Sequence, residues 1–288
     1  MDNGEDRVGG TKVILMEQTK FSVLMSLYIK EQPEFFSACM NSMFKQTVKP
    51  AEIVIVLDGP ITPGLIAVLE DYQNKYPDII VTVPLPENKG LGLALAEGIK
   101  HCNYEIVARM DTDDIARADR FEKQLAEFAK NPELDICGSH IIEFEGTIEN
   151  VLSKRMVPLT HADIAKYQKQ RSAFNHMTVM YKKSMVLKAG NYQHLPLMED
   201  DLMWIHMLQA GAHCGNIDDF LVYARTGYNM IERRGGRSYL KKYIHGRKVI
   251  LDTGYISQWD FWKTVLVQVV VALVPKKLRL FIFTKALR

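Results

Sequence analysis

Three carboxylates, Asp111, Asp113 and Asp114, stand within four residues directly after the apolar run Ile106–Met110. Carboxylates this close repel one another, which is costly unless a cation lies between them. Mg²⁺ or Mn²⁺ suits such a site best, because these ions take one or two protein carboxylates and complete their shell with substrate phosphates and water. Asp111 and Asp113 therefore predict a clamp for a divalent metal and a diphosphate. The structural alternative is a solvated acidic turn that caps the next helix.

A second acidic cluster, formed by Glu199, Asp200 and Asp201, opens a helix-like stretch that runs through Trp204 and Leu208. The positive N-terminal end of a helix tolerates anions, so simple helix capping would explain the cluster. A carboxylate held apart from a metal site is also suited to take a proton from an attacking hydroxyl. We therefore predict a general base here, in a segment separate from the metal carboxylates.

A glycine-rich cationic strip lies between Arg225 and Arg237. Guanidinium groups bind phosphate oxygens through paired hydrogen bonds and keep their charge. The strip predicts a mobile lid that orders over a bound diphosphate, with a solvated surface loop as the alternative. Its arginines are Arg225, Arg233, Arg234 and Arg237.

The elements that must position these residues begin with short apolar runs that alternate with helix-like stretches. Such runs suit strands buried on both faces. Strands that alternate with helices pair in parallel through right-handed crossovers, which predicts an α/β fold with an open, doubly wound, Rossmann-like sheet whose ligands bind beyond the C-terminal strand ends. The predicted strands are Phe21–Leu27, Ile53–Leu57, Ile79–Val83 and Ile106–Met110, and the predicted helices are Pro33–Lys45, Pro63–Lys75 and Leu91–Lys100.

The alternation lapses from Asp135 onward, which predicts a mixed or antiparallel second half that completes the same domain. We divide the chain into a loose tail (1–19), a nucleotide-binding half (20–114), an acceptor half (115–240) and a C-terminal helical segment (241–288). The elements expected in the second half are a helix at Asp119–Lys130, strand material at Ile136–Phe144 and Val151–Met156, an apolar segment at Phe174–Tyr181, a helix from Glu199 and a strand near Phe220–Tyr223.

Bulk composition excludes several classes of protein. The 288 residues carry a formal net charge of only +2, so no polyanion-binding field exists and no nucleic-acid partner is expected. The N-terminus lacks the apolar core of a signal peptide, which places the catalytic part in the cytoplasm. Four well-separated cysteines form no C-x-x-C pair, and we expect them to be buried thiols.

The C-terminal segment combines apolar and cationic residues. Phe261–Val274 is largely apolar but shorter than the roughly twenty residues that span a bilayer, and no acidic residue follows Asp260. We expect a helix pair that lies on the cytoplasmic face of an anionic membrane. A helix packed on the catalytic domain, or a homodimer interface, is the alternative.

The motifs, taken in order, resemble those of the family-two inverting glycosyltransferases, which build bacterial capsules, O-antigens and exopolysaccharides. The likeness spans roughly Lys20 to Tyr239, and each motif alone would be weak. The matching segments are Ser22–Tyr28, Glu52–Gly59, Asn88–Gly92, Met110–Asp114, Asn175–His176, Gly190–Tyr192, Met198–Asp201 and Arg233–Gly236.

The resemblance implies a GT-A fold that binds a nucleoside-diphosphate sugar, usually a UDP-sugar, with Mn²⁺ or Mg²⁺. In this comparison Asp58 would meet the base, Tyr28 and Glu31 would enclose it, and Asp111 and Asp113 would lie at the ribose and at the metal. The full set expected at the nucleotide is Ser26, Tyr28, Glu31, Asp58, Lys89, Asp111, Arg233 and Arg234.

The resemblance also makes Asp200 the catalytic base, with Asp201 as a rival and Glu199 as an acceptor-orienting group. Asn175 and His176 would line the acceptor pocket, and the acceptor would be a saccharide, possibly polyprenyl-diphosphate-linked. Two other hypotheses remain at this point. A sugar-phosphate nucleotidyltransferase would need a glycine-rich loop after the first strand, which Ser26–Lys30 does not supply. A catalytically degenerate membrane-associated scaffold would keep the fold without turnover.

Overall fold

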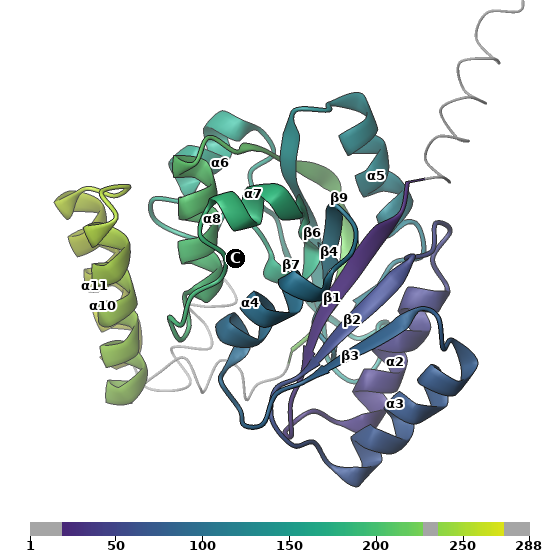
Figure 1. The fold of residues 1–288 in the computed structure, drawn as a ribbon. Helices are drawn as coiled ribbons and strands as arrows, with labels where there is room; N and C mark the ends of the chain where they lie inside the picture. The colour runs from purple at the N-terminus through teal and green to yellow at the C-terminus, as the bar shows by residue number, and fades with distance from the viewer. Residues whose placement is uncertain (1–18, 227–235, 274–288) are drawn as a thin grey trace, which may run out of the picture.

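Four parallel strands form the N-terminal half of one sheet, as the sequence predicted (Figure 1). A computed structural model of the chain describes residues 19–226 and 236–273. The strand Phe21–Leu27 lies between its two parallel neighbours, and all four strands end near the predicted residues. The strands are β1 (Phe21–Leu27), β2 (Glu52–Leu57), β3 (Ile80–Pro84) and β4 (Ile106–Arg109).

Alternate residues of these strands supply the two faces of the sheet. Val23 and Met25 of β1 pack in one hydrophobic cluster, whereas Leu24 packs in the other. This period of two arises because successive side chains of a strand point to opposite faces. The cluster on the first face takes residues from α2 (Pro33–Phe44), α3 (Pro63–Lys75) and α5 (Arg120–Lys130). The cluster on the second face takes residues from α4 (Leu91–His101) and α8 (Glu199–Gln209), and also Ile164 and Val186 from two shorter helices.

Helix α4 approaches the sheet closely at Gly98. A Cβ atom at this position would lie 2.5 Å from Leu24 Cδ1 and 2.6 Å from Val56 Cγ2. The absence of a side chain therefore allows the helix to pack directly on β1 and β2. The start of α4 lies at the C-terminal edge of the parallel strands.

The second half of the sheet is mixed, as expected. The short strand β8 pairs antiparallel with β4, and β6 pairs parallel with β9, in the order β3-β2-β1-β4-β8-β6-β9-β5 with β7 beside β6. The apolar segment Phe174–Tyr181 becomes a short helical turn, η1 (His176–Thr178), followed by β8. The strands are β5 (Ile115–Ala116), β6 (Leu134–Phe144), β7 (Val151–Arg155), β8 (Met180–Lys182) and β9 (His213–Arg225).

The C-terminal helices form a hairpin against α8 (Figure 1). Ile205 of α8 packs with Ile250 and Val265 of the hairpin in a third hydrophobic cluster. The sequence predicted a helical segment from residue 241 onward, and the first of these helices begins five residues earlier, at Gly236. Within 19–226 and 236–273, no helix combines the length and apolarity that crossing a bilayer requires. The helices are α10 (Gly236–Asp252) and α11 (Gln258–Leu273), and the short helices α6 (His161–Tyr167) and α7 (Lys183–Lys188) were not predicted.

The four cysteines are buried thiols without disulfide bonds, which confirms the prediction. Burial raises the pKa of Cys102, Cys137 and Cys214 to about 12. The nucleophilic thiolate is therefore scarce at neutral pH, and these side chains act as small apolar groups of the core.

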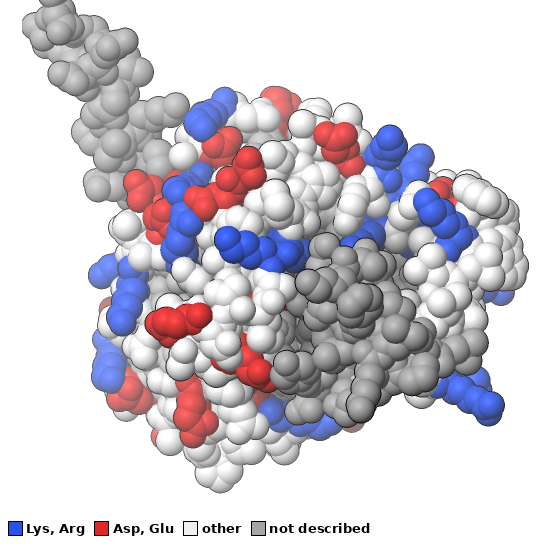
Figure 2. Space-filling view, turned by 180° about the vertical axis from the view of Figure 1, so that it is seen from behind, with Lys and Arg blue, Asp and Glu red and all other residues white. Residues whose placement is uncertain are grey.

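Charged side chains of both signs are interspersed on the face of the molecule shown in Figure 2. Opposite charges at such short spacing cancel one another beyond a Debye length. The mixed surface agrees with the small net charge of the whole chain.

Candidate active site

A cleft of about 540 Å³ opens at the C-terminal ends of the parallel strands. Its walls come from the ends of β1, β2 and β4 and from the start of α4, which are the positions where ligands bind in open α/β sheets. Six residues predicted from the sequence meet here: Ser26, Tyr28, Glu31, Asp58, Asp111 and Asp113. The cleft is further lined by Lys30, Gln32, Phe35, Asn88, Gly90, Leu91 and Thr112.

Four carboxylates line this cleft, and those of Glu31, Asp111 and Asp113 influence one another. Burial raises the pKa of Asp113 from 3.8 to about 7, and the charges of Asp111 and Glu31 add to the rise. The neighbouring Asp114 is buried and accepts a hydrogen bond of 2.7 Å from the backbone N–H of Arg225, so it belongs to the framework of the site. The cleft thus concentrates negative charge that a cation would neutralise.

The chemistry of Asp111 and Asp113 fits a divalent metal ion bound together with a diphosphate. Asp111 Oδ1 already pairs with Arg109 Nη2 at 2.5 Å, which leaves Asp111 Oδ2 and the carboxylate of Asp113 for a ligand. No group of three or more Asp, Glu, His or Cys side chains within the described ranges is arranged to hold a metal by itself. Mg²⁺ and Mn²⁺ need only one or two protein carboxylates when substrate phosphates complete the shell.

Asp58 holds the turn that forms one wall of the cleft. Its carboxylate accepts three hydrogen bonds, from Lys89 N at 2.7 Å, Asn88 Nδ2 at 2.9 Å and Gly90 N at 3.1 Å. An ionised carboxylate offers about four acceptor sites. Asp58 therefore keeps roughly one site for a ligand N–H while it shapes the loop.

The loop after β1 supplies the remaining predicted nucleotide contacts. Tyr28 is 38% exposed on the cleft. Glu31 accepts hydrogen bonds of 2.7 Å from Thr112 Oγ1 and from Gln32 N, which tie the loop to the acidic segment. Lys89 is exposed and does not line the cleft as the structure stands. Its predicted role at the nucleotide stays a prediction.

Arg225 has a different place from the one predicted. It is the last residue of β9 and not part of a loop, and its guanidinium lies 4.0 Å from the ring centre of Phe35 and 4.6 Å from that of Phe144. Arg225 Nε donates to the carbonyl oxygen of Asp113 at 3.0 Å. The side chain therefore holds the backbone of the acidic segment at Asp113. The predicted lid residues Arg233 and Arg234 lie outside the described residues.

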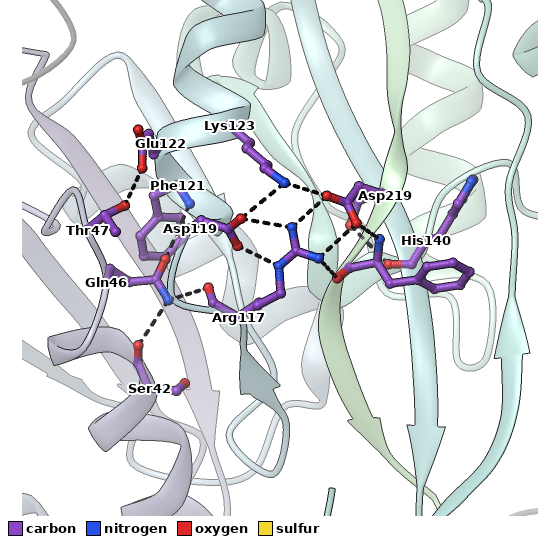
Figure 3. Close-up of polar contacts among 12 residues, drawn as sticks. Ser42, Gln46, Thr47, Arg117, Asp119, Phe121, Glu122, Lys123, His140 and Asp219 are labelled. Atoms are coloured by element: carbon purple, nitrogen blue, oxygen red, sulfur yellow. Dashed lines mark hydrogen bonds and ion pairs between the residues drawn. The ribbon is translucent and has the colours of Figure 1, made fainter. Parts of the chain in front are cut away.

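The chain beyond the acidic segment is anchored by Arg117 (Figure 3). Its guanidinium pairs with Asp119 at 2.5 Å and with Asp219 of β9 at 2.5 Å, and Lys123 of α5 contacts both carboxylates. Gln46 Nε2 donates to the Arg117 carbonyl at 2.8 Å. These contacts join α2, α5 and β9 around the segment that leaves the cleft.

The second acidic cluster opens α8, as predicted, and two of its members line a second cleft of about 430 Å³. Asp201 accepts a hydrogen bond of 2.8 Å from Gln168 Nε2, whereas Asp200 has no side-chain hydrogen-bond partner among the described residues and stays partly exposed. Burial, with the charges of Asp201 and Glu199, raises the pKa of Asp200 well above its ordinary value. Of the three carboxylates, Asp200 is best placed to accept a proton from a molecule in this cleft.

Arg109 links the two acidic clusters, and the sequence analysis missed it. It is only 1% exposed, and its Nε and Nη1 atoms have no hydrogen-bond partner within 19–226 and 236–273. Its guanidinium pairs with Asp111. Burial raises the pKa of Glu199, and the charge of Arg109 opposes that rise. An arginine at the end of a buried apolar run, directly before the acidic motif, was the signal that could have revealed it.

Asn175 and His176 line neither of the two clefts. Asn175 Nδ2 donates to the Ser139 carbonyl at 2.8 Å, and His176 Nε2 lies 3.2 Å from the hydroxyl of Tyr192. Burial and the charge of Arg109 hold the pKa of His176 well below its ordinary value, so the ring is neutral. An acceptor-binding role for both residues stays a prediction.

Known proteins with similar sequences are glycosyltransferases. An Erwinia amylovora protein, the amylovoran biosynthesis glycosyltransferase AmsE, is 38% identical over 92% of this chain and 98% of its own length. An Escherichia coli UDP-Gal:alpha-D-GlcNAc-diphosphoundecaprenol beta-1,3-galactosyltransferase is 36% identical over 93% of this chain and 97% of its own length.

The fold is likewise that of known glycosyltransferases. The mannosyltransferase PcManGT from Pyrobaculum calidifontis, solved with GDP-Man and Mn²⁺, superposes with a TM-score of 0.60 over 94% of this chain and 80% of its own, at 13% identity. This likeness confirms the predicted GT-A fold. The sequence pattern of glycosyl transferase family 2 matches residues 22–194, more than half of the chain. The chain therefore belongs to glycosyl transferase family 2.

Proposed function

We propose that this protein transfers a sugar from a UDP-sugar to a lipid-linked saccharide, with inversion at the anomeric carbon. The observation that carries the proposal is the pair of neighbouring clefts. One presents the acidic residues suited to a metal and a diphosphate, and the other presents Asp200, a carboxylate suited to act as a base. Family membership removes the sugar-phosphate nucleotidyltransferase from consideration.

The start of α4 joins the two clefts. Gly90 and Leu91 line the first cleft, hereafter the donor cleft. The next residue, Gly92, packs so closely on the segment before Asp200 that a Cβ atom would lie 2.5 Å from Gln193 O and 3.1 Å from Glu199 Cβ. The start of α4, which lines the donor cleft, thus packs against the segment that leads into Asp200 of the second cleft.

The transfer is a single displacement. The acceptor hydroxyl oxygen forms a bond to the anomeric carbon while the bond from that carbon to the β-phosphate oxygen breaks. UDP leaves with the electron pair, and the hydroxyl proton passes to the carboxylate of Asp200. Because burial and nearby charges raise the pKa of Asp200, its ionised form is a stronger base than an ordinary aspartate.

Asp111 and Asp113 would hold a Mn²⁺ or Mg²⁺ ion, which when bound would stabilise the charge that develops on the departing diphosphate. Arg225 supports the backbone of Asp113, and Arg109 orients the carboxylate of Asp111. The side chains are thereby held before the donor arrives, which preorganises the site.

The choice of UDP and of a lipid-linked acceptor rests on the E. coli relative, whose name specifies UDP-Gal and a diphosphoundecaprenol-linked sugar. The E. amylovora relative is named for amylovoran biosynthesis. Both match nearly the whole chain, so we propose a role in the assembly of a cell-envelope polysaccharide.

The outer face of α11 supports an association with the inner face of the cell membrane. Trp259 is 76% exposed and Trp262 is 55% exposed, and apolar residues continue this face along the helix. Five Lys and Arg residues follow in the sequence after Val274. Aromatic and apolar residues next to cations are typical of helices that lie in an anionic interface. The remaining exposed apolar residues of α11 are Leu266, Val267 and Val270.

The test compares the wild type with Asp200→Asn. We expect the variant to bind UDP with Mn²⁺ in calorimetry as the wild type does, and to lose transfer by a factor of about 10²–10⁴, the usual contribution of a general base. Asp252→Asn, on the exposed end of α10, is the matched control. Wild-type transfer by Asp200→Asn would refute the assignment of the base. A wild-type protein that binds UDP but neither transfers nor hydrolyses any UDP-sugar would instead support the scaffold hypothesis.

A further inference from the structure

The second cleft is built from segments that lie far apart in the sequence. The start of α8 contributes Asp200 at one wall, the segment 170–172 and β7 contribute a second, and the inner faces of α10 and α11 contribute a third. The cleft combines cations with an apolar wall, which is an unusual mixture for a saccharide pocket. The apolar side chains are Leu197, Met198, Val267 and Val271, and the cations are Arg155, Arg171, Arg247 and Lys263.

The cations outnumber the carboxylates of this cleft. Four cationic side chains line it, against the carboxylates of Asp200 and Asp201. One of the carboxylates, Asp201, is held by Gln168 at 2.8 Å. An anionic ligand would therefore find an excess of positive charge in the same cleft as the proposed base, Asp200.

Buried side-chain nitrogens of the cleft, one in Arg247 and one in Gln268, have no hydrogen-bond acceptor in the part of the chain that the structure describes. Arg247 is 3% exposed, and although its Nη2 donates to the Lys169 carbonyl at 2.7 Å, its Nε has no acceptor. The amide nitrogen of Gln268 is likewise buried without an acceptor. Unsatisfied buried donors cost free energy that a ligand with several acceptor oxygens would recover. Phosphate groups offer such oxygens and pair well with guanidinium groups.

The apolar wall leads from the cleft to the outside of α11. Val271 is 3% exposed inside the cleft, whereas Val267, one turn earlier, is 49% exposed. Leu266 and Val270 continue the apolar surface on the outer face that we assigned to the membrane. A hydrocarbon chain could thus run from the cations to a bilayer without crossing polar surface.

We infer that the second cleft binds the diphosphate and first isoprene units of a polyprenyl-diphosphate-linked acceptor, hereafter the lipid-diphosphate site. The cations would hold the diphosphate, Val267 and Val271 would contact the lipid, and the attached sugar would extend toward Asp200. This inference rests on the proposed glycosyl transfer, and it assigns residues to the acceptor that no similarity identifies.

The direct test titrates the full chain with farnesyl diphosphate, a short polyprenyl diphosphate, in detergent below its micelle concentration. The titration is repeated with saturating UDP and Mn²⁺, which occupy the donor cleft. We expect binding to persist with UDP present, and we expect inorganic diphosphate to bind more weakly because it lacks the hydrocarbon chain. Displacement of farnesyl diphosphate by UDP would place the ligand in the donor cleft and overturn the inference.

Two exposed cations at the mouth of the cleft, Arg171 and Lys263, are the positions to change. Each loses about one charge-assisted hydrogen bond on substitution by glutamine, so the double variant should bind farnesyl diphosphate about 100-fold more weakly. Lys248→Gln, an exposed cation of α10 outside the cleft, is the matched control and should bind as the wild type does. Equal affinity in the double variant and the control would overturn the inference.

A third variant, Val267→Asp, tests the lipid wall separately. It should remove the preference for farnesyl diphosphate over inorganic diphosphate while it leaves the affinity for inorganic diphosphate nearly unchanged. A retained preference would show that the hydrocarbon chain of the lipid does not contact Val267. If the wild type binds anionic vesicles but not farnesyl diphosphate, the outer face of α11 binds the bilayer and the lipid-diphosphate site does not exist.

Activity in the same samples separates this inference from the proposed function. The double variant should keep its affinity for UDP and its transfer to a neutral glycoside of the acceptor sugar, and lose transfer to the diphosphate-linked acceptor through a raised KM. A wild type without any transfer would refute the proposed function, while the farnesyl diphosphate titration would still decide whether the lipid-diphosphate site exists.

Discussion

Replacing Asp113 with asparagine should stabilise the free protein and abolish metal-dependent nucleotide binding. Burial and the charges of Asp111 and Glu31 raise the pKa of Asp113 from 3.8 to about 7. Folding therefore costs free energy whenever this carboxylate is ionised. Asparagine has nearly the same size and no charge, so it removes that cost together with a metal ligand.

The size of the stabilisation follows from the pKa shift. A fully buried, isolated group with this shift would correspond to about 4 kcal/mol, at about 1.4 kcal/mol for each pKa unit. Asp113 is partly exposed, so solvent screens the repulsion and we expect about 1–2 kcal/mol. For a chain of this length the midpoint of thermal unfolding should rise by roughly 2–5 °C.

The effect has a definite pH dependence. The pKa of Asp113 is higher in the folded than in the unfolded state, so the cost is fully present above a pH of about 7 and is lost as the pH falls toward 3.8. The stabilisation by asparagine should therefore be largest near about pH 8 and should disappear near about pH 4.

Calorimetric unfolding without metal at three pH values measures this effect, and titration with UDP and Mn²⁺ measures the lost binding. Asp71→Asn is the matched control, because Asp71 is an exposed partner of Lys75 on α3. A variant at Asp113 that melts at or below the wild-type temperature at every pH would contradict the electrostatic cost of this carboxylate. A variant that still binds UDP through Mn²⁺ would contradict its role at the metal.

Three further predictions concern the packing of α4 on the sheet, the contact of Arg225 with the acidic segment, and the proposed base Asp200. In denaturant titrations, Gly98→Ala should lower the free energy of unfolding by about 1–3 kcal/mol, because the added Cβ would overlap two side chains of the sheet. Gly215→Ala is the control and should change the free energy of unfolding little, because its Cβ would make an ordinary contact at 3.4 Å. Arg225→Lys cannot stack on both rings and should weaken Mn²⁺-dependent UDP binding about tenfold in calorimetry, since lysine lacks the planar guanidinium; an unchanged affinity would contradict its supporting role. The rate of transfer should fall with decreasing pH as Asp200, whose pKa is raised, becomes protonated, and the residual rate of Asp200→Asn should lack this limb.

The parallel half of the fold could be predicted closely from the sequence. Its strands are short apolar runs such as Phe21–Leu27, and its helices begin at recognisable prolines, Pro33 and Pro63. Apolar runs and helix-starting prolines are local features of the sequence, so these strands and helices can be predicted without knowledge of tertiary contacts. The donor cleft followed, because the positions of Asp58 and Asp111 at strand ends depend only on the order of the strands.

The rest depends on contacts between distant segments. The length of β9 arises from its pairing with β6, and Arg225 is a strand residue because this pairing continues to Phe144. Helix α10 is rich in charge on its exposed side, and it packs on α8 only through scattered apolar residues such as Ile250. The lipid-diphosphate site could not be predicted either, because its walls come from four separate parts of the chain.

The stereochemistry of the product tests whether this protein transfers a sugar from a UDP-sugar with inversion. The full chain is incubated with Mn²⁺, a panel of α-linked UDP-sugars and a diphosphate-linked acceptor, and the anomeric configuration of the new linkage is determined by NMR together with UDP release. Transfer with inversion predicts a β-linked product and the release of one UDP for each linkage formed. An α-linked product, or transfer that releases another nucleotide, would contradict it.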